Sequence, residues 1–303
     1  MKEEKTFPYL RRQVWESRLW YVMTPVYAGV FIVGKTVRCA PLQEKTKSLK
    51  PKEMERQVLF MNGLAKSIAD NLVFFLEFLG IVVLIFVAAL IIQKVADKKN
   101  GRTQKIFTTR MMAVTGMLSA ISLILYMLDF PLPFLAPGHY KLDFSELPVM
   151  IGSFAFGPVA GVLVEFCKVV LKIIIKGTDT AFVGDLANFT IGCSLLLPAS
   201  LVYEFKKTKK SAILGCVLGT VCITLFGTAL NAWYLLPKYA EMYGIPLDAL
   251  IAGGTAINPA ITSLTTYVCF AVAPINIIKG GVISLLTMLI YKPLSPILKT
   301  GHR

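Results

Sequence analysis

The chain has 303 residues, of which 55% are hydrophobic and only 17% are charged, and its mean hydropathy is +0.64. Soluble domains carry about 25% charged residues because a folded surface must be wetted. The apolar residues come in long blocks, so the composition indicates a membrane protein and excludes an ordinary soluble domain. The net charge of +14 would suit nucleic acid, but the basic residues gather beside the apolar blocks, so we expect a lipid bilayer and no nucleic acid as partner.

The N-terminal part of the chain carries one clear membrane span. Residues 1–71 form an extension without a clear pattern, in which residues 19–33 are apolar but short for a span and interrupted by Pro25. Residues 72–93 have the length of about 20 residues that a transmembrane helix needs. We therefore predict one extra transmembrane helix here, or two if residues 19–33 also cross.

Opposite charge biases define an inner and an outer side. Residues 94–110 contain six basic residues against one acid, which predicts a basic cytoplasmic linker. Residues 204–210 and the tail 294–303 are also basic and are expected in the cytoplasm. By contrast, residues 129–147 and 237–258 each carry more acids than bases, so we place both on the outside.

Residues 111–293 predict a core of six transmembrane helices. The chain is outside at residue 147 and inside at residue 206, so it must cross an odd number of times between them. Residues 159–175 and 186–203 supply two crossings, so a third must fall in residues 145–156. These twelve residues cover roughly 18 Å, which is less than the hydrocarbon core of about 30 Å. This helix must be shielded by its neighbours or begin in the outer loop. The other five spans cover residues 111–128, 159–175, 186–203, 211–235 and 262–289.

The sequence nominates no catalytic or metal site. It contains no G-x-x-x-x-G-K-[ST] phosphate loop and no H-E-x-x-H motif, and its only histidines are His139 and His302. Its six cysteines lack the paired C-x-x-C spacing of a zinc site. We therefore predict that the chain is not an enzyme and holds neither metal nor cofactor.

Polar residues at membrane depth are costly and usually serve a purpose. The third core helix carries one polar stripe, made of Glu165, Lys168, Lys172 and Lys176. The stripe predicts either a Glu165–Lys168 ion pair with the outer lysines reaching to the interface, or a face for a partner helix or a ligand. Asp185 opens the next helix and is expected to cap it near the surface.

A second polar group lies toward the outer ends of the last two helices. Asn231 stands just before Trp233 and Tyr234, while Asn276 and Lys279 share a face of the sixth helix. Amides offer a donor and an acceptor together, which suits an imide or pteridine-like edge, and lysine adds a donor toward carbonyls. The alternative is hydrogen bonding between helices, worth about 0.6–2 kcal/mol per pair.

Five motifs carry a resemblance to a known family. They are PLPFLAPGHYKLDFSELP (131–148), FGPVAGVL (156–163), GDLANFTIG (184–192), NAWYLLPKY (231–239) and PINIIKG (274–280). Together they resemble the riboflavin-binding S components, the substrate-binding subunits, of energy-coupling factor (ECF) transporters. The resemblance implies an all-α integral membrane protein whose six-helix core, residues 111–293, follows the extra helix or helices.

The resemblance also implies a function. It predicts capture of riboflavin outside a bacterial cell and its delivery inward with a transmembrane scaffold protein and two cytoplasmic ATPases. An S component for thiamin, folate or pantothenate, or less readily a membrane enzyme, remains an alternative. The implied substrate-binding residues are Lys141, Leu142, Asp143, Phe144, Asn231, Asn276 and Lys279, with Leu142 against the flavin ring. The implied contacts to the scaffold are the small residues Ala113, Gly116 and Ala120.

Overall fold

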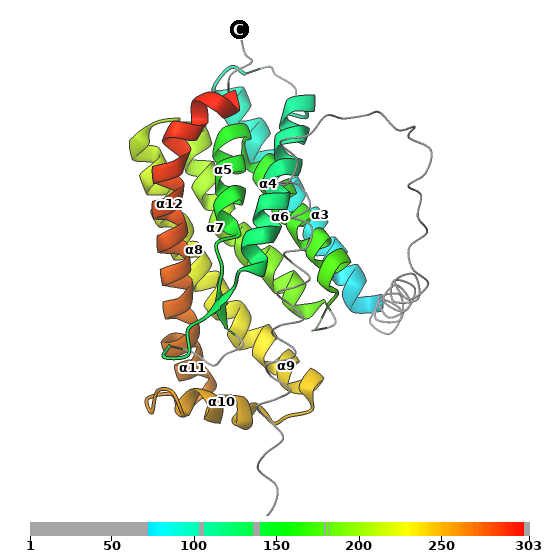
Figure 1. Cartoon of the computed structure of the whole chain (residues 1–303), viewed down its shortest axis with the longest axis vertical. Coiled ribbons are helices and arrows are strands. Elements are labelled where there is room, and N and C mark those ends of the chain that lie inside the picture. Colours follow the sequence, from blue (N-terminus) through cyan, green and yellow to red (C-terminus); the bar gives the residue numbers. More distant parts are fainter. Residues whose placement is uncertain (1–71, 103–105, 136–139, 179, 181, 300–303) are drawn as a thin grey trace, which may run out of the picture. The chain divides into compact units, whose positions relative to one another are not determined.

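The computed structural model describes residues 72–102, 106–135, 140–178, 180 and 182–299, and these are almost wholly helical (Figure 1). The extension predicted over residues 1–71, including the candidate span 19–33, lies outside the described residues. The α-helices are α3 (Leu72–Lys99), α4 (Thr109–Met127), α5 (Glu146–Phe156), α6 (Pro158–Lys176), α7 (Val183–Phe205), α8 (Lys209–Leu230), α9 (Leu236–Tyr243), α10 (Leu247–Thr255), α11 (Leu264–Tyr267) and α12 (Ala273–Lys299).

Helix lengths agree with a chain that crosses the membrane many times. Within the described residues, five helical stretches are long and apolar enough to span a bilayer: Phe75–Lys99, Thr109–Met127, Val183–Phe205, Lys209–Met242 and Leu264–Leu294. The 19-residue helix α6 is also long, but it carries the charged stripe. With the short α5, the described chain supplies the six predicted core helices and the extra helix α3 before them.

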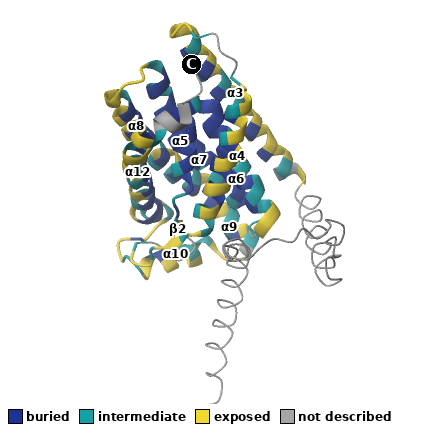
Figure 2. Cartoon of the chain, turned by 45° about the horizontal axis from the view of Figure 1, so that its top comes forward, coloured by how far each residue is buried: buried dark blue, intermediate teal, exposed yellow. Residues whose placement is uncertain are grey.

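The short helix inferred from charge parity is α5. Its 11 residues rise roughly 16 Å, and most of them are buried against α4, α6, α7 and α12. Figure 2 shows α5 and α7 among the most deeply buried parts of the bundle. The prediction of a short helix shielded by its neighbours is therefore confirmed.

Gly157 and Pro158 separate α5 from α6. Gly157 has φ +99°, a conformation that strains residues with a side chain, and Pro158 begins α6, where a missing N–H costs nothing. The Gln93 side chain of α3 joins the two helix ends: its Nε2 donates to the Phe156 carbonyl at 3.2 Å, and its Oε1 accepts from the Val159 N–H at 3.2 Å. The break thus satisfies backbone groups that helix ends leave unpaired.

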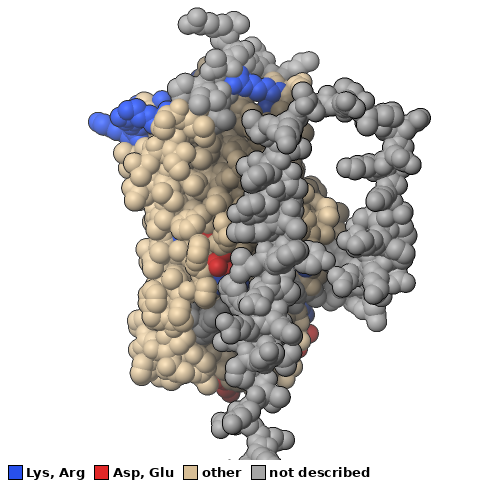
Figure 3. Space-filling view, viewed as in Figure 1, with Lys and Arg blue, Asp and Glu red and all other residues tan. Residues whose placement is uncertain are grey.

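The basic segments predicted for the cytoplasm meet at one end of the bundle. Arg102, after α3, and Lys207, after α7, lie 2.7 and 2.9 Å from the buried carboxylate of Glu204. Figure 3 shows Lys and Arg gathered at the end where α12 finishes in Figure 1, opposite α10. The arrangement agrees with the inner and outer sides inferred from charge.

Helix boundaries differ from the prediction at the two sides of the bundle. α3 continues past residue 92 to Lys99, so the predicted linker is largely helical in its first part. The fifth core helix was expected to end at residue 235, but it passes through the π-helical turn η1 (Asn231–Leu235) into α9. The predicted outer loop 237–258 then forms α10.

Both π-helical turns stand directly before a proline. In η1 the Leu236 N–H bonds to the Asn231 carbonyl, and Pro237 follows; in η2 (Val268–Val272) the Ala273 N–H bonds to the Val268 carbonyl, and Pro274 follows. Proline cannot donate a helical hydrogen bond and clashes with the preceding turn, so a widened turn accommodates it. The fifth core helix therefore continues past its predicted end at residue 235, and the sixth passes through Pro274 within its predicted range 262–289.

Candidate ligand-binding site

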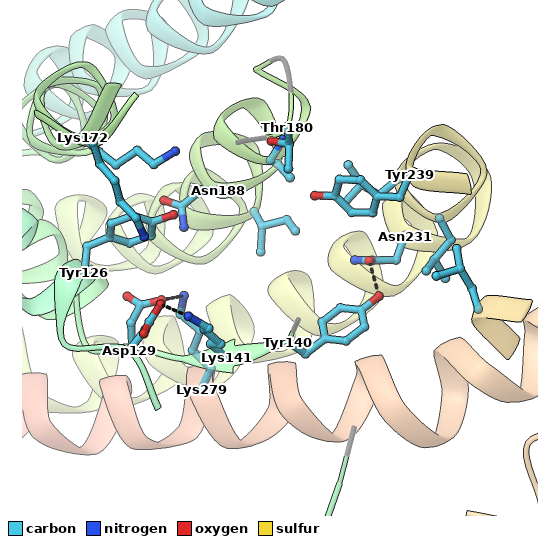
Figure 4. A pocket seen from close by; sticks show the side chains of 18 residues that line it. Tyr126, Asp129, Tyr140, Lys141, Lys172, Thr180, Asn188, Asn231, Tyr239 and Lys279 are labelled. Carbon is cyan, nitrogen blue, oxygen red and sulfur yellow. Dashed lines mark hydrogen bonds and ion pairs between the residues drawn. The ribbon is translucent and has the colours of Figure 1, made fainter. Parts of the chain in front are cut away.

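A cavity of about 480 Å³ opens among the helices near the outer loops. Its volume falls within the range of roughly 300–1,000 Å³ that is usual for small-molecule sites. Polar and charged side chains enter it from several helices and from the loop after α4 (Figure 4). Its lining consists of Tyr126, Asp129, Tyr140, Lys141, Asp143, Lys172, Lys176, Thr180, Gly184, Ala187, Asn188, Ile191, Asn231, Leu235, Leu236, Tyr239, Leu250 and Lys279.

The loop between α4 and α5 covers part of the cavity. Its two short strands, β1 (Phe130–Pro131) and β2 (Lys141–Leu142), pair antiparallel, and Lys141 forms a 2.8 Å ion pair with Asp129. Beside the strands, the Phe144 and Phe130 rings lie 6.3 Å apart. Leu142 and Phe144 are half-buried under this loop and lie outside the cavity lining.

Asn231 is held at the wall of the cavity by two hydrogen bonds. Its Nδ2 donates to the Gly227 carbonyl at 2.8 Å, and its Oδ1 accepts from the Tyr140 hydroxyl at 2.8 Å. Figure 4 shows the Tyr140 hydroxyl pointing at the Asn231 amide, with a dashed line for the hydrogen bond. Burial raises the pKa of Tyr140 well above its ordinary value, so its hydroxyl remains a donor. The bond links the outer loop to the π turn.

Lys279 enters the cavity from α12 and pairs with two acids. Its Nζ lies 3.0 Å from Asp143 Oδ2 and 3.0 Å from Glu146 Oε2. Burial opposes ionisation of Asp143, but Lys279, Lys168 and hydrogen bonds from Ser145 outweigh it and lower the pKa of Asp143 to about 2. The carboxylate is therefore a fixed negative partner for Lys279.

The pairs continue deeper into the bundle. Lys168 Nζ lies 2.6 Å from Glu165, 3.5 Å from Glu146 and 3.1 Å from the Ser145 hydroxyl. The predicted Glu165–Lys168 pair is therefore confirmed. We call the five connected side chains the acid–base cluster: Asp143, Glu146, Glu165, Lys168 and Lys279.

Asp185 and Lys172 correct one prediction. Asp185 was expected to cap a helix near the surface, but it is 2% exposed and lies 2.7 Å from Lys172 Nζ. Lys172 is likewise buried, so it does not reach to the interface, whereas Lys176 at the end of α6 is exposed. The turn between α6 and α7 brings Lys172 and Asp185 together, and helix-surface spacing alone did not reveal that.

The predicted substrate-binding residues occupy different places. Lys141, Asp143, Asn231 and Lys279 line the cavity together. Asn276 lies outside the lining, where its amide packs against Gly227 so closely that a Cβ there would lie 2.6 Å from Nδ2. That Nδ2 is buried and has no hydrogen-bond partner among the described residues.

Sequence reasoning missed part of the cavity lining. Tyr140 and Tyr239 stand inside motifs that carried the family resemblance, and Asn188 follows Asp185 by one helical turn. Their positions in those segments were a usable signal. Lys172 belongs to the polar stripe for which a ligand face was one of the two predictions, and it lines the cavity. Tyr126 could be found only through the packing of α4, because its segment gave no sign of facing a ligand.

The small residues expected to meet a scaffold protein lie on the outside of the bundle. Ala113, Gly116 and Ala120 are all exposed on one side of α4, together with Met117. No Cβ contact within 4 Å would oppose a side chain at Gly116. This face of α4 is therefore open to another helix or to lipid.

A bundle of membrane-crossing helices with a polar cavity near its outer end defines a multi-pass membrane protein that takes a small molecule from the outer side. Residues 110–291 match the family model described as "ECF transporter, substrate-specific component". The chain belongs to this family. It is therefore a transporter component of the bacterial cell membrane and not an enzyme, as predicted.

The chain matches named relatives over most of their own length. The chain is 37% identical over 201 residues to "Riboflavin transporter RibU" of Staphylococcus aureus (strain TCH60), covering 66% of this chain and 98% of that protein. It is 34% identical over 186 residues to "Riboflavin transporter FmnP" of Bacillus subtilis (strain 168), covering 61% and 92%. A solved structure titled "Structure and mechanism of the S component of a bacterial ECF transporter" is 35% identical, with a TM-score of 0.49, covering 62% of this chain and 97% of that one.

Proposed function

We propose that this chain captures riboflavin at the outer face of the cell membrane and delivers it inward with a transmembrane scaffold protein and two cytoplasmic ATPases. The observation that carries the proposal is the cavity near the outer loops, where Asn231 and Lys279 converge beside apolar walls. The names of the relatives, riboflavin transporters, support the choice of ligand.

The chemistry of the cavity suits a flavin. The ring system is flat and largely apolar but has one polar edge, and burying that edge without partners costs about 1–3 kcal/mol per group. Lysine and amide side chains can replace the lost water. In this structure Lys279 is held by Asp143, and Asn231 is held by Tyr140. Both Asp143 and Tyr140 lie on the outer loop, so ligand entry that moves this loop would release Asn231 from Tyr140 and leave Lys279 paired with Glu146 alone.

The experiment is a titration of the purified protein with riboflavin, followed by quenching of flavin fluorescence. We expect Lys279→Ala to weaken binding at least tenfold, about 1.4 kcal/mol. We expect the same of Asn276→Ala, because Asn276 lies one helical turn before Lys279 on α12 and its buried Nδ2 has no partner among the described residues. Lys238→Ala is the matched control, because the Lys238 side chain is 38% exposed, lies outside the cavity lining and forms its ion pair with Glu241. Unchanged affinity in both test variants would remove these residues from the site, and quenching by none of the preparations would reject riboflavin as ligand.

Transport itself requires the other components, because the chain has no phosphate loop. Proteoliposomes that hold this chain alone are expected to bind riboflavin without accumulating it. Accumulation by the chain alone would refute the need for partners. Exposed Gly116 supports α4 as the docking face, so Gly116→Leu should reduce co-purification with the scaffold protein while riboflavin binding persists.

A further inference from the structure

The acid–base cluster has more acids than bases. It contains three carboxyl groups and two ammonium groups, and each of its members exposes 8% of its surface or less. The nearby Lys172 does not correct the imbalance, because it pairs with Asp185 at 2.7 Å. A fully ionised cluster would therefore hold one uncompensated negative charge away from water, which is so costly that buried groups neutralise instead.

The three carboxyl groups are not equally stabilised as anions. Asp143 accepts hydrogen bonds from the Ser145 N–H and from Lys279, at 2.9 and 3.0 Å. Glu146 forms ion pairs with Lys279 Nζ at 3.0 Å and with Lys168 Nζ at 3.5 Å. Glu165 has a 2.6 Å ion-pair contact with Lys168 alone, and its carboxyl has no other polar partner among the described residues.

Glu165 is also the most enclosed of the three. Its side chain is 0% exposed, and its carboxyl lies against Gly192 of α7, where an added Cβ would be 2.5 Å from Oε1. Lys168, its one ionic partner, is shared with Glu146 and with the Ser145 hydroxyl. A proton on Glu165 would remove the excess charge at the position least able to hold it.

We propose that the acid–base cluster is a proton-binding site in which Glu165 carries the proton in part of the ligand-free molecules at neutral pH, and in nearly all of them once a ligand has engaged Lys279. When a ligand draws the Lys279 ammonium toward itself, the carboxylates of Asp143 and Glu146 lose part of their compensation. Lys168 then turns further toward Glu146, and the cluster binds protons more tightly. Ligand binding is therefore accompanied by proton uptake, and affinity rises as the pH falls.

The groups that surround Glu165 fit this assignment. Lys279 comes from α12, Asp143 from the outer loop and Glu146 from α5. Lys168 and Lys172 come from α6, and Asp185 and Cys193 come from α7. α4 places the Tyr126 ring 5.7 Å from Lys168 Nζ, and α3 meets α6 with the Phe86 ring. The titratable or charged neighbours are Lys279, Asp143, Glu146, Lys168, Lys172, Asp185, Tyr126 and Cys193.

Infrared spectroscopy of the ligand-free protein tests the proton directly. A protonated carboxylic acid has a carbonyl stretch well apart from the carboxylate bands and shifts in heavy water. We expect such a band in the wild type and in the control Glu241→Gln, and its loss in Glu165→Gln. A wild type without the band, or a band that survives in Glu165→Gln, overturns the proposal.

Thermal unfolding gives a second, independent readout. Glutamine resembles a protonated glutamate in shape and charge, so Glu165→Gln should keep the apparent Tm within about 2 °C of the wild type. If Glu165 is instead an anion that Lys168 requires, the same variant leaves a lysine partly uncompensated and lowers the Tm by about 5 °C or more. That loss would reject Glu165 as the proton carrier.

The link to the ligand rests on the proposed function and is tested separately. Calorimetry of riboflavin binding in buffers of different ionisation enthalpy should report an uptake of about half a proton or more near neutral pH. The uptake should fall toward zero in Glu165→Gln and remain in Glu241→Gln. Binding without uptake breaks the link, whereas absence of binding, with the infrared band present, contradicts the proposed ligand and leaves the proton site standing.

Discussion

Two buried polar junctions hold α6 in place, and they are built differently. At the α5–α6 break, the neutral amide of Gln93 bonds through its oxygen and its nitrogen to backbone groups. In the acid–base cluster, three carboxyl groups share two ammonium groups, and among the described residues Glu165 has Lys168 as its one polar partner. A neutral and satisfied junction only holds helices together. A charged junction with an unsatisfied member can also respond to a ligand or a proton.

Removing a base from the charged junction should have the largest effect. Lys168→Met leaves three buried carboxyl groups with one ammonium, and breaking a buried pair in this way costs about 3–5 kcal/mol. The apparent Tm in detergent should fall by about 10 °C or more. Lys176→Met, at the exposed end of the same helix, is the control and should change stability by less than about 0.5 kcal/mol. Equal Tm values for the two variants would contradict a buried cluster.

The neutral junction should be the next most sensitive. Gln93→Leu leaves the Phe156 carbonyl and the Val159 N–H without this partner, and we expect a loss of about 2 kcal/mol. Val95→Leu, exposed on the same helix, should be close to neutral. Because Gln93 does not line the cavity, riboflavin affinity should stay within about threefold. A large loss of riboflavin affinity at unchanged stability would contradict the view that the Gln93 junction only holds helices together.

A methyl group aimed at Glu165 offers a milder perturbation. In Gly192→Ala the new Cβ would lie 2.5 Å from Glu165 Oε1, so the carboxyl must shift, at a cost of about 1–2 kcal/mol. Gly281→Ala is the matched control, since nothing lies within 4 Å of its Cβ position, and alanine should favour the helix there. Thermal unfolding of the two variants should therefore move in opposite directions.

The smallest effect is expected at the outer loop. Tyr140→Phe removes the hydrogen bond to Asn231 Oδ1 and should cost about 1 kcal/mol of stability. Since Asn231 is then free of a competitor, fluorescence titration should show no loss of riboflavin affinity. A pronounced loss would mean that Tyr140 itself contacts the ligand.

The sequence predicted the number and order of the described core helices, because apolar length decides which segments can cross a bilayer. It also predicted the Glu165–Lys168 pair, whose members are one helical turn apart. It did not predict the Lys172–Asp185 pair or the Gln93 contacts, since these depend on how separate helices rotate against each other. It placed the end of the fifth helix too early, at the end of the apolar run 211–235, whereas the helix continues past Pro237 into α9.

Each π turn has a geometric consequence for the cavity. A π turn holds one residue more than an α turn, so it changes the direction in which all later side chains point. In η1 this sets the orientation of Leu236 and Tyr239, which lie in the cavity wall. The same residues wound as a continuous α-helix, without the π turn, would turn both side chains by roughly 100° away from the cavity. Which side chains line the cavity therefore depends on the number of residues in the helical turn, as well as on their identity.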